Sequence, residues 1–258
     1  IHMLSEKMSL NGKNVLVSGG AGFIGSHLVK RLLNEGAKVS VIVRYDSIID
    51  NVRLAPVWNK INIIEADIKN IDSLTQIKDL SPDIVYHLAA YNHVGHSFLH
   101  VNEALDSNAK GTANVIESYS DFERFVYISS SEIYGHQEEV PFLESMNPYP
   151  ISPYAVGKYA GELYCKMKQH MMPGKIAIIR PFNAFGPYQS EKAVIPELIR
   201  KCIVGETIKT TQGKQTREFN FVENLVDGFI VAANHEKAVN NVVNLCASEE
   251  ISIKDLVQ

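Results

Sequence analysis

The sequence has 258 residues, of which 45% are hydrophobic and 21% are charged, and its formal net charge at pH 7 is −4. A chain of this composition can bury a sizeable core, and its evenly spread charges leave no basic stripe for nucleic acid. No apolar run reaches the ~18 residues of a membrane span, and Cys165, Cys202 and Cys246 form no disulfide or metal pattern. With no signal-peptide pattern, the sequence predicts a cytoplasmic protein without nucleic-acid, membrane or metal partners.

Short apolar runs alternate with helical patterns along the first two thirds of the chain. Strands are expected where Val and Ile cluster, and helices where apolar residues recur at helical spacing. The runs are apolar throughout, as parallel strands buried on both faces require. The pattern therefore predicts a doubly wound α/β fold with a parallel sheet. The expected strands are 14–18, 39–43, 61–64, 84–88, 124–129 and 176–179.

After Pro181 the alternation of apolar runs and helical patterns ends, and a segment rich in Gly, Pro and Asn predicts a loop. A helix is expected over 194–204, and short strands over 208–210 and 218–221. We expect residues 9–181 to form a dinucleotide-binding domain to which 222–246 returns. Residues 182–221 and 247–258 would form a smaller α/β substrate lobe, and the chain is expected to continue beyond Gln258, which lies inside a new helical pattern.

A glycine-rich turn separates the first strand from the first helix. Gly19, Gly22 and Gly25 follow the spacing G-x-x-G-x-x-G, and Phe23 and Ile24 open the helix. Glycine lets the backbone turn sharply and approach a pyrophosphate, and the helix N-terminus attracts that anion. The turn predicts a nicotinamide dinucleotide site, although a structural turn in an unrelated α/β domain would read similarly.

The end of the second strand should select between NAD and NADP. An acid there binds the adenosine ribose hydroxyls, whereas an arginine accommodates a 2′-phosphate. Arg44 follows Val43 at this place, which slightly favours NADP. NAD stays open, since Arg44 can equally be a solvated loop residue. Asp67, with Ile68 beside it, follows the third strand and is expected near the adenine.

A catalytic pair is expected at the start of the helix after Pro153. Ser152 is a candidate cap, and Tyr154 and Lys158 lie four residues apart on one helix face. A phenol has a pKa near ~10, too high for a base at neutral pH. A neighbouring ammonium and a positive nicotinamide would lower the pKa of Tyr154.

Three polar residues end the fifth strand. Ser130, Ser131 and Glu132 follow it at the carboxyl edge of the sheet, where ligands of such folds bind. A serine hydroxyl can hydrogen-bond a sugar hydroxyl or a carbonyl oxygen, and a nearby acid can remove a proton from the adjacent carbon. A solvated turn is the alternative.

Together these motifs resemble the extended short-chain dehydrogenase/reductase family, specifically its nucleotide-sugar epimerases and dehydratases. The resemblance runs from about Lys13 to the last residue and implies a Rossmann-type domain and a nucleotide-diphosphate sugar as substrate. The matching segments are 19–25, 87–90, 93–94 with Ser97, 108–112, 130–135, 154–158, 180–183 and 216–222.

The resemblance implies roles for individual residues. Tyr154 would take the proton of the sugar's carbon-4 hydroxyl, Lys158 would bind the ribose, and Ser130 would hydrogen-bond the same oxygen. Members of the family commonly form homodimers through the helices around 100–118 and 154–170, and Leu163 and Met167 suit such a face, although intramolecular burial would suit them too. The cofactor trough would include Leu88, Ala89 and Ala90, and the substrate would contact Asn108, Asn183, Val194 and Arg217.

Glu132 indicates the subtype. Family members that only epimerise usually lack an acid there, whereas 4,6-dehydratases and sugar-acid decarboxylases have one. The resemblance therefore implies a 4,6-dehydratase, with Ser131 in the place of the residue that protonates the leaving hydroxyl, acting on UDP-N-acetylglucosamine. A 4-epimerase, a UDP-glucuronate decarboxylase and a dinucleotide-binding sensor without catalysis are the alternatives. The last usually lacks the tyrosine or lysine present here at 154 and 158.

Overall fold

A computed structural model describes residues 9–45, 52–208 and 212–257 of the protein. Its largest element is a seven-stranded sheet in the order β3-β2-β1-β4-β5-β6-β9 whose strand pairings are all parallel. The sheet confirms the predicted doubly wound α/β fold. The strands are β1 Asn14–Ser18, β2 Lys38–Val43, β3 Asn62–Glu65, β4 Ile84–His87, β5 Arg124–Ile128, β6 Ile176–Pro181 and β9 Val242–Leu245.

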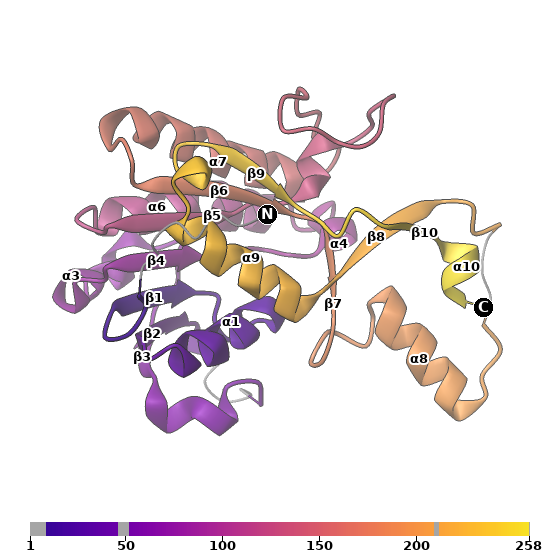
Figure 1. Ribbon diagram of the computed structural model, residues 1–258, viewed down its shortest axis with the longest axis horizontal. Coiled ribbons are helices and arrows are strands. Elements are labelled where there is room, and N and C mark those ends of the chain that lie inside the picture. The colour runs from indigo at the N-terminus through magenta and orange to yellow at the C-terminus, as the bar shows by residue number, and fades with distance from the viewer. Residues whose placement is uncertain (1–8, 46–51, 209–211, 258) are drawn as a thin grey trace.

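Helices cover both faces of this sheet (Figure 1). One face carries α1 (Phe23–Asn34) and α9 (Val222–Asn234), and the other carries α6 (Gly111–Ser118) and α7 (Pro153–Met171). A π-helical turn at Asp106–Lys110 joins α5 to α6. The shorter helices are α3 Ile77–Leu80, α4 Val94–Ser97, α5 Val101–Leu105 and the 3-10 turns Ala55–Lys60, Ile71–Leu74, Ser131–Tyr134 and Glu236–Ala238.

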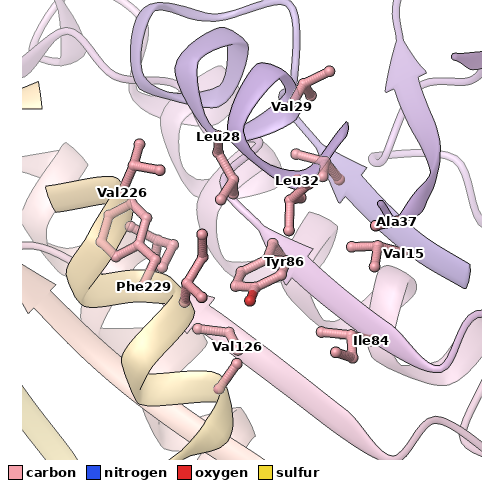
Figure 2. Packing of buried hydrophobic residues seen from close by; sticks show 14 of the residues in the cluster. Val15, Leu28, Val29, Leu32, Ala37, Ile84, Tyr86, Val126, Val226 and Phe229 are labelled. Atoms are coloured by element: carbon pink, nitrogen blue, oxygen red, sulfur yellow. The ribbon is translucent and has the colours of Figure 1, made fainter. Parts of the chain in front are cut away.

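Alternate residues of each strand supply two separate cores, because successive side chains point to opposite faces. On β1, Val15 and Val17 pack toward α1 and α9, and Leu16 packs toward α6 and α7. Figure 2 shows the first core, where Leu28 and Leu32 of α1 and Phe229 of α9 pack over the same face of the strands. Burial on both faces explains why the central residues of these strands are mostly apolar on both faces.

One polar atom lies unpaired inside the first core. Tyr86 is fully buried, and its hydroxyl has no hydrogen-bond partner among the described residues (Figure 2). Because an unsatisfied buried hydroxyl is costly, Tyr86→Phe should raise the free energy of unfolding by about 1 kcal/mol, measured by urea denaturation. The matched control is Tyr127→Phe, which removes a buried hydroxyl that donates to the Lys158 carbonyl oxygen at 2.9 Å and should lower stability. A loss of stability in Tyr86→Phe would contradict the prediction.

A second, three-stranded sheet has the order β10-β8-β7. Strand β8 runs parallel to β7 and antiparallel to β10, and α8 lies beside this sheet, away from the larger one (Figure 1). The predicted helix 194–204 and the strand at 218–221 are confirmed; Ile208 is in no strand, and residues 209–210 lie outside the described residues. The bounds are β7 Asn183–Phe185, α8 Val194–Val204, β8 Thr216–Phe221, β10 Glu250–Ser252 and α10 Ile253–Val257.

The two sheets support the predicted division into domains, which stays a proposal. Helix α9 and strand β9 return to the larger sheet, as expected for 222–246, while β7, α8, β8 and β10 belong to the lobe. Across the described residues, no helix is long and apolar enough to cross a membrane.

Candidate active site

The glycine-rich turn joins β1 to α1 with a geometry that requires glycine. Gly19 has a φ of +74°, and a side chain on Gly25 would collide with the Gly19 carbonyl oxygen. Gly22 caps α1 without a side-chain hydrogen bond, and the first turn of the helix carries no acid. The N-terminal amides of α1 are thus left for an anion, which fits the pyrophosphate of a dinucleotide.

A pocket of about 480 Å³ opens beside this turn and brings together most of the predicted cofactor residues. It extends from the turn across the ends of β2, β3 and β4. Phe23, Ile24 and Gly25 lie just past it in the first turn of α1. The predicted residues that line the pocket are Gly19, Gly22, Arg44, Asp67, Ile68, Leu88, Ala89 and Ala90.

His87 fixes the wall of this pocket. Thr112 Oγ donates to the Asn108 carbonyl, so Thr112 must accept from His87 Nε2, 3.0 Å away. His87 Nδ1 then accepts from Ser18 Oγ at 2.6 Å, and Ser18 accepts from the Ala89 amide. Burial lowers the pKa of His87 to about 3, so the ring is neutral. It acts as a connector between β1 and β4.

Three charged pocket residues were missed by the sequence reasoning. Lys69 Nζ lies 2.8 Å from Glu103 and 3.5 Å from Asp67, so it partly neutralises both acids. Arg53 Nε donates to the Tyr188 carbonyl oxygen at 3.1 Å. No local motif marks Glu103 or Arg53, because each meets the pocket only through the fold. Lys69, two residues after Asp67, could have been found from that spacing.

The N-terminus of α7 is anchored as predicted. Ser152 Oγ accepts from the Ala155 amide at 3.1 Å, which confirms the cap, and Pro153 occupies the first turn. The Tyr154 amide donates to Ser97 Oγ at 3.2 Å, which ties α7 to α4. These contacts fix the backbone from which Tyr154 projects.

Tyr154 and Lys158 are both buried, and burial shifts the pKa of each. Burial raises the pKa of Tyr154 to about 12, a hydrogen bond with Ser130 opposes the rise, and the Glu132 carboxylate adds to it. Burial also lowers the pKa of Lys158 to about 8. Lys158 Nζ donates to the Ile128 carbonyl at 2.8 Å in the protein without cofactor. The lowering of the Tyr154 pKa by an ammonium together with a positive nicotinamide stays a prediction. A dinucleotide would supply positive charge at Tyr154.

The end of β5 brings the second set of predicted residues to Tyr154. Ser130 is buried and caps a 3-10 turn, Ser131–Tyr134, by accepting from the Glu132 amide at 3.2 Å. Ser130 and Glu132 both influence the Tyr154 phenol. Glu132 is half-buried, and its carboxyl group is the only acidic group in this turn. Ser131 opens the turn, and its catalytic role stays a prediction.

Asn108 anchors a loop of the backbone through its side-chain amide. It is buried in the π-helical turn, where its amide accepts from the Tyr91 backbone N–H at 2.7 Å and donates to the Tyr91 carbonyl at 3.1 Å. A side chain at Gly161 of α7 would meet the Asn108 carbonyl oxygen and the Tyr127 hydroxyl. The amide of Asn108 therefore holds the loop after β4 against α7, and its contact with substrate stays a prediction.

The other predicted substrate residues lie in the smaller lobe. Asn183 Nδ2 donates to the Glu218 carbonyl at 3.1 Å, exposed Arg217 donates to the Thr216 carbonyl at 2.7 Å, and Val194 begins α8. In the described part of the chain, no hydrogen bond links these three residues to Tyr154. Their contact with substrate stays a proposal.

Fold and site together define a dinucleotide-dependent enzyme of the short-chain dehydrogenase/reductase class. The model of the NAD dependent epimerase/dehydratase family matches residues 15–246. The chain belongs to this family, which confirms the resemblance seen in the sequence.

Known members are similar over most of their length. The dTDP-D-glucose 4,6-dehydratase of Bos taurus is 31% identical over 95% of this chain and 72% of its own. A putative UDP-glucose 4-epimerase of Methanocaldococcus jannaschii is 33% identical over 94% of this chain and 79% of its own. The dTDP-glucose 4,6-dehydratase of Streptomyces venezuelae, solved with NAD bound, superimposes with a TM-score of 0.86 at 26% identity over 95% of this chain and 79% of its own. Relatives thus include both dehydratases and epimerases.

Proposed function

We propose that the protein is a nucleotide-sugar 4,6-dehydratase that uses NAD or NADP, with UDP-N-acetylglucosamine as the substrate to test first. One observation carries the proposal: Glu132 lies on the turn that Ser130 caps, and both side chains act on the phenol of Tyr154. An acid in this place can remove a proton from the carbon next to the one that Tyr154 serves. A 4-epimerase needs no such base.

The residues divide the reaction between them. Tyr154 takes the proton of the carbon-4 hydroxyl, and Ser130 hydrogen-bonds that oxygen. A nicotinamide dinucleotide held beside Gly19 and Gly22 would supply the reversible hydride transfer that this reaction needs. Glu132 removes the proton on carbon 5, which the new carbonyl has made acidic, and passes this proton to the carbon-6 hydroxyl, which leaves as water. Lys158, one turn after Tyr154 on α7, would hold the cofactor ribose.

The experiment is incubation of the protein with cofactor and a set of nucleotide sugars, followed by mass spectrometry. The expected product of UDP-N-acetylglucosamine is a 4-keto-6-deoxy sugar lighter by one water. An isomer of unchanged mass would contradict the dehydratase and favour the 4-epimerase. Carbon dioxide release from UDP-glucuronate would favour the decarboxylase.

We propose NADP as the preferred cofactor, since two cations line the adenosine end of the pocket. Arg44 and Arg53 both reach it, while Asp67 and Glu103 are paired with Lys69. Arg44→Ala should weaken NADPH binding about tenfold and leave NADH binding nearly unchanged, measured by fluorescence titration. Exposed Lys60→Ala is the control. Tighter binding of NADH by the unmodified protein would contradict the preference and leave NAD.

We also propose a homodimer built on α7. Leu163 and Met167 are 50% and 44% exposed, so intramolecular burial does not account for them. Val156 on α7 and Phe98 and Leu99 just after α4 are exposed apolar residues as well. Exposed apolar residues that gather on one surface are typical of a protein–protein interface. Leu163→Asp should convert a dimer to a monomer in light scattering, whereas Val231→Asp on α9 should not. An unmodified protein of monomer mass would contradict the proposal.

A further inference from the structure

A buried ion pair lies behind the catalytic residues. Glu162 of α7 and Arg180 of β6 are 0% and 1% exposed, and their side chains form two hydrogen bonds of 2.8 and 2.9 Å. Glu162 also accepts from Ser129 Oγ at 2.6 Å. Such a pair is costly to desolvate, and apolar residues of similar volume often serve stability as well. Its presence therefore calls for a reason other than stability.

The pair is bonded to both ends of the segment that carries Ser130 and Glu132. Ser129, held by Glu162, directly precedes this segment. Tyr134 closes it, and its hydroxyl accepts from Arg180 Nη1 at 2.7 Å. The same hydroxyl donates to Asn244 Oδ1 on β9 at 2.7 Å. The Arg180 guanidinium and the Glu162 carboxylate thus join β6, β9 and the end of β5 to the 3-10 turn Ser131–Tyr134.

The pair is also attached to the helix of the other catalytic residues. Glu162 lies one turn beyond Lys158 on α7, and its charge raises the pKa of Lys158 against the effect of burial. Lys158 in turn donates to the carbonyl of Ile128, two residues before Ser130. Glu162 therefore contacts the strand end directly and acts on Lys158 through its charge.

We propose that Glu162 and Arg180 are positioning residues that set Glu132 and Ser130 at a fixed place relative to Tyr154 and Lys158. The proposal rests on the function proposed above, in which proton removal by Glu132 must follow oxidation at carbon 4. Neither residue touches the substrate. Displacement of a catalytic group by about 1 Å can lower the rate on the order of 10²-fold. Loss of the hydrogen bonds made by Glu162 and Arg180 can therefore slow the reaction strongly.

The first test separates the two chemical steps. Tyr134→Phe keeps the packing and the ion pair but removes the bond from Arg180 to the Glu132 turn. Water loss should slow about tenfold relative to reduction of bound cofactor, so that the reduced nicotinamide accumulates in single-turnover absorbance. Tyr164→Phe is the control, since Tyr164 lies on α7 and its hydroxyl donates to Glu117 of α6 at an exposed place. Equal slowing of both steps would indicate a purely structural role.

The second test uses the charge of Glu162. The rate of cofactor reduction should rise with pH as Tyr154 ionises and stop rising where the Lys158 ammonium is lost. Glu162→Gln removes a negative charge that favours this ammonium, so the break should move to lower pH, with folding at each pH checked by circular dichroism. The positioning role would be overturned by two results together. The rate of cofactor reduction would stop rising at the same pH in Glu162→Gln and in the unmodified protein, and Tyr134→Phe would slow water loss no more than Tyr164→Phe does.

The two proposals fail in different ways. Absence of water loss in the unmodified protein would contradict the dehydratase alone. The pH break is measured on cofactor reduction, which an epimerase also performs, so it still tests whether Glu162 acts on Lys158. A shift of the break in Glu162→Gln supports that action under either function.

Discussion

Replacement of Tyr154 by phenylalanine is expected to abolish reduction of the bound cofactor by a nucleotide sugar. The phenol is buried against Ser130 at the start of α7, and it is the group placed to take the proton of the reacting hydroxyl. Loss of a general base typically costs about 10²–10⁴-fold. Both cofactor absorbance and product mass should show this loss.

The same variant should lose a pH dependence. The pKa of Tyr154 is raised to about 12 in the protein without cofactor, so the rate should climb with pH as the active phenolate form grows. Phenylalanine cannot ionise, and any residual rate should lack this climb. Tyr149→Phe is the control, because that ring is 65% exposed on the loop before α7. Full turnover by Tyr154→Phe would refute the assigned base.

Replacement of Glu132 by glutamine is expected to separate oxidation from water loss. Glutamine keeps the size of the side chain but cannot remove the carbon-5 proton, so water release should fall about 10²–10⁴-fold. The Glu132 charge raises the pKa of Tyr154, so its removal lowers that pKa. Cofactor reduction at neutral pH should then be at least as fast as in the unmodified protein.

The Glu132 variant is measured by single-turnover absorbance and by product mass in the same reaction. Glu139→Gln, on the exposed loop that follows the turn, controls for loss of a nearby charge. Water release by Glu132→Gln at the unmodified rate would assign the elimination base to another residue. A parallel loss of both steps would indicate that Glu132 acts on Tyr154 instead of on carbon 5.

The fold could be predicted because its signals are local. Strands such as β1 and β4 are buried on both faces and are apolar at every position but their ends, and Gly25 is required by a contact within its own turn. The Ser152 cap and the spacing of Tyr154 and Lys158 are likewise contained in one helix. For these features, neighbouring residues carry the whole physical reason.

The parts that could not be predicted depend on contacts between distant residues. Glu162 reads as an ordinary acid of an amphipathic helix, yet it meets Arg180, 18 positions away, and through it Tyr134. Asn108 belongs to a recognisable motif, but only the π-helical turn shows that its amide faces Tyr91. The direction of Lys158 Nζ depends on where β5 ends beneath α7. No spacing in the sequence encodes these pairings.

The neutral state of His87 has a consequence for kinetic measurements. The imidazole shapes the trough through Ser18 and Thr112, and burial lowers its pKa to about 3. An ordinary histidine would change charge near pH ~6.5 and would loosen the trough there. Because His87 keeps one protonation state, the architecture of the trough should be constant from weakly acidic to alkaline buffers. Inflections across that range then do not arise from His87, although His93, Asp67 and Glu103 also line the pocket.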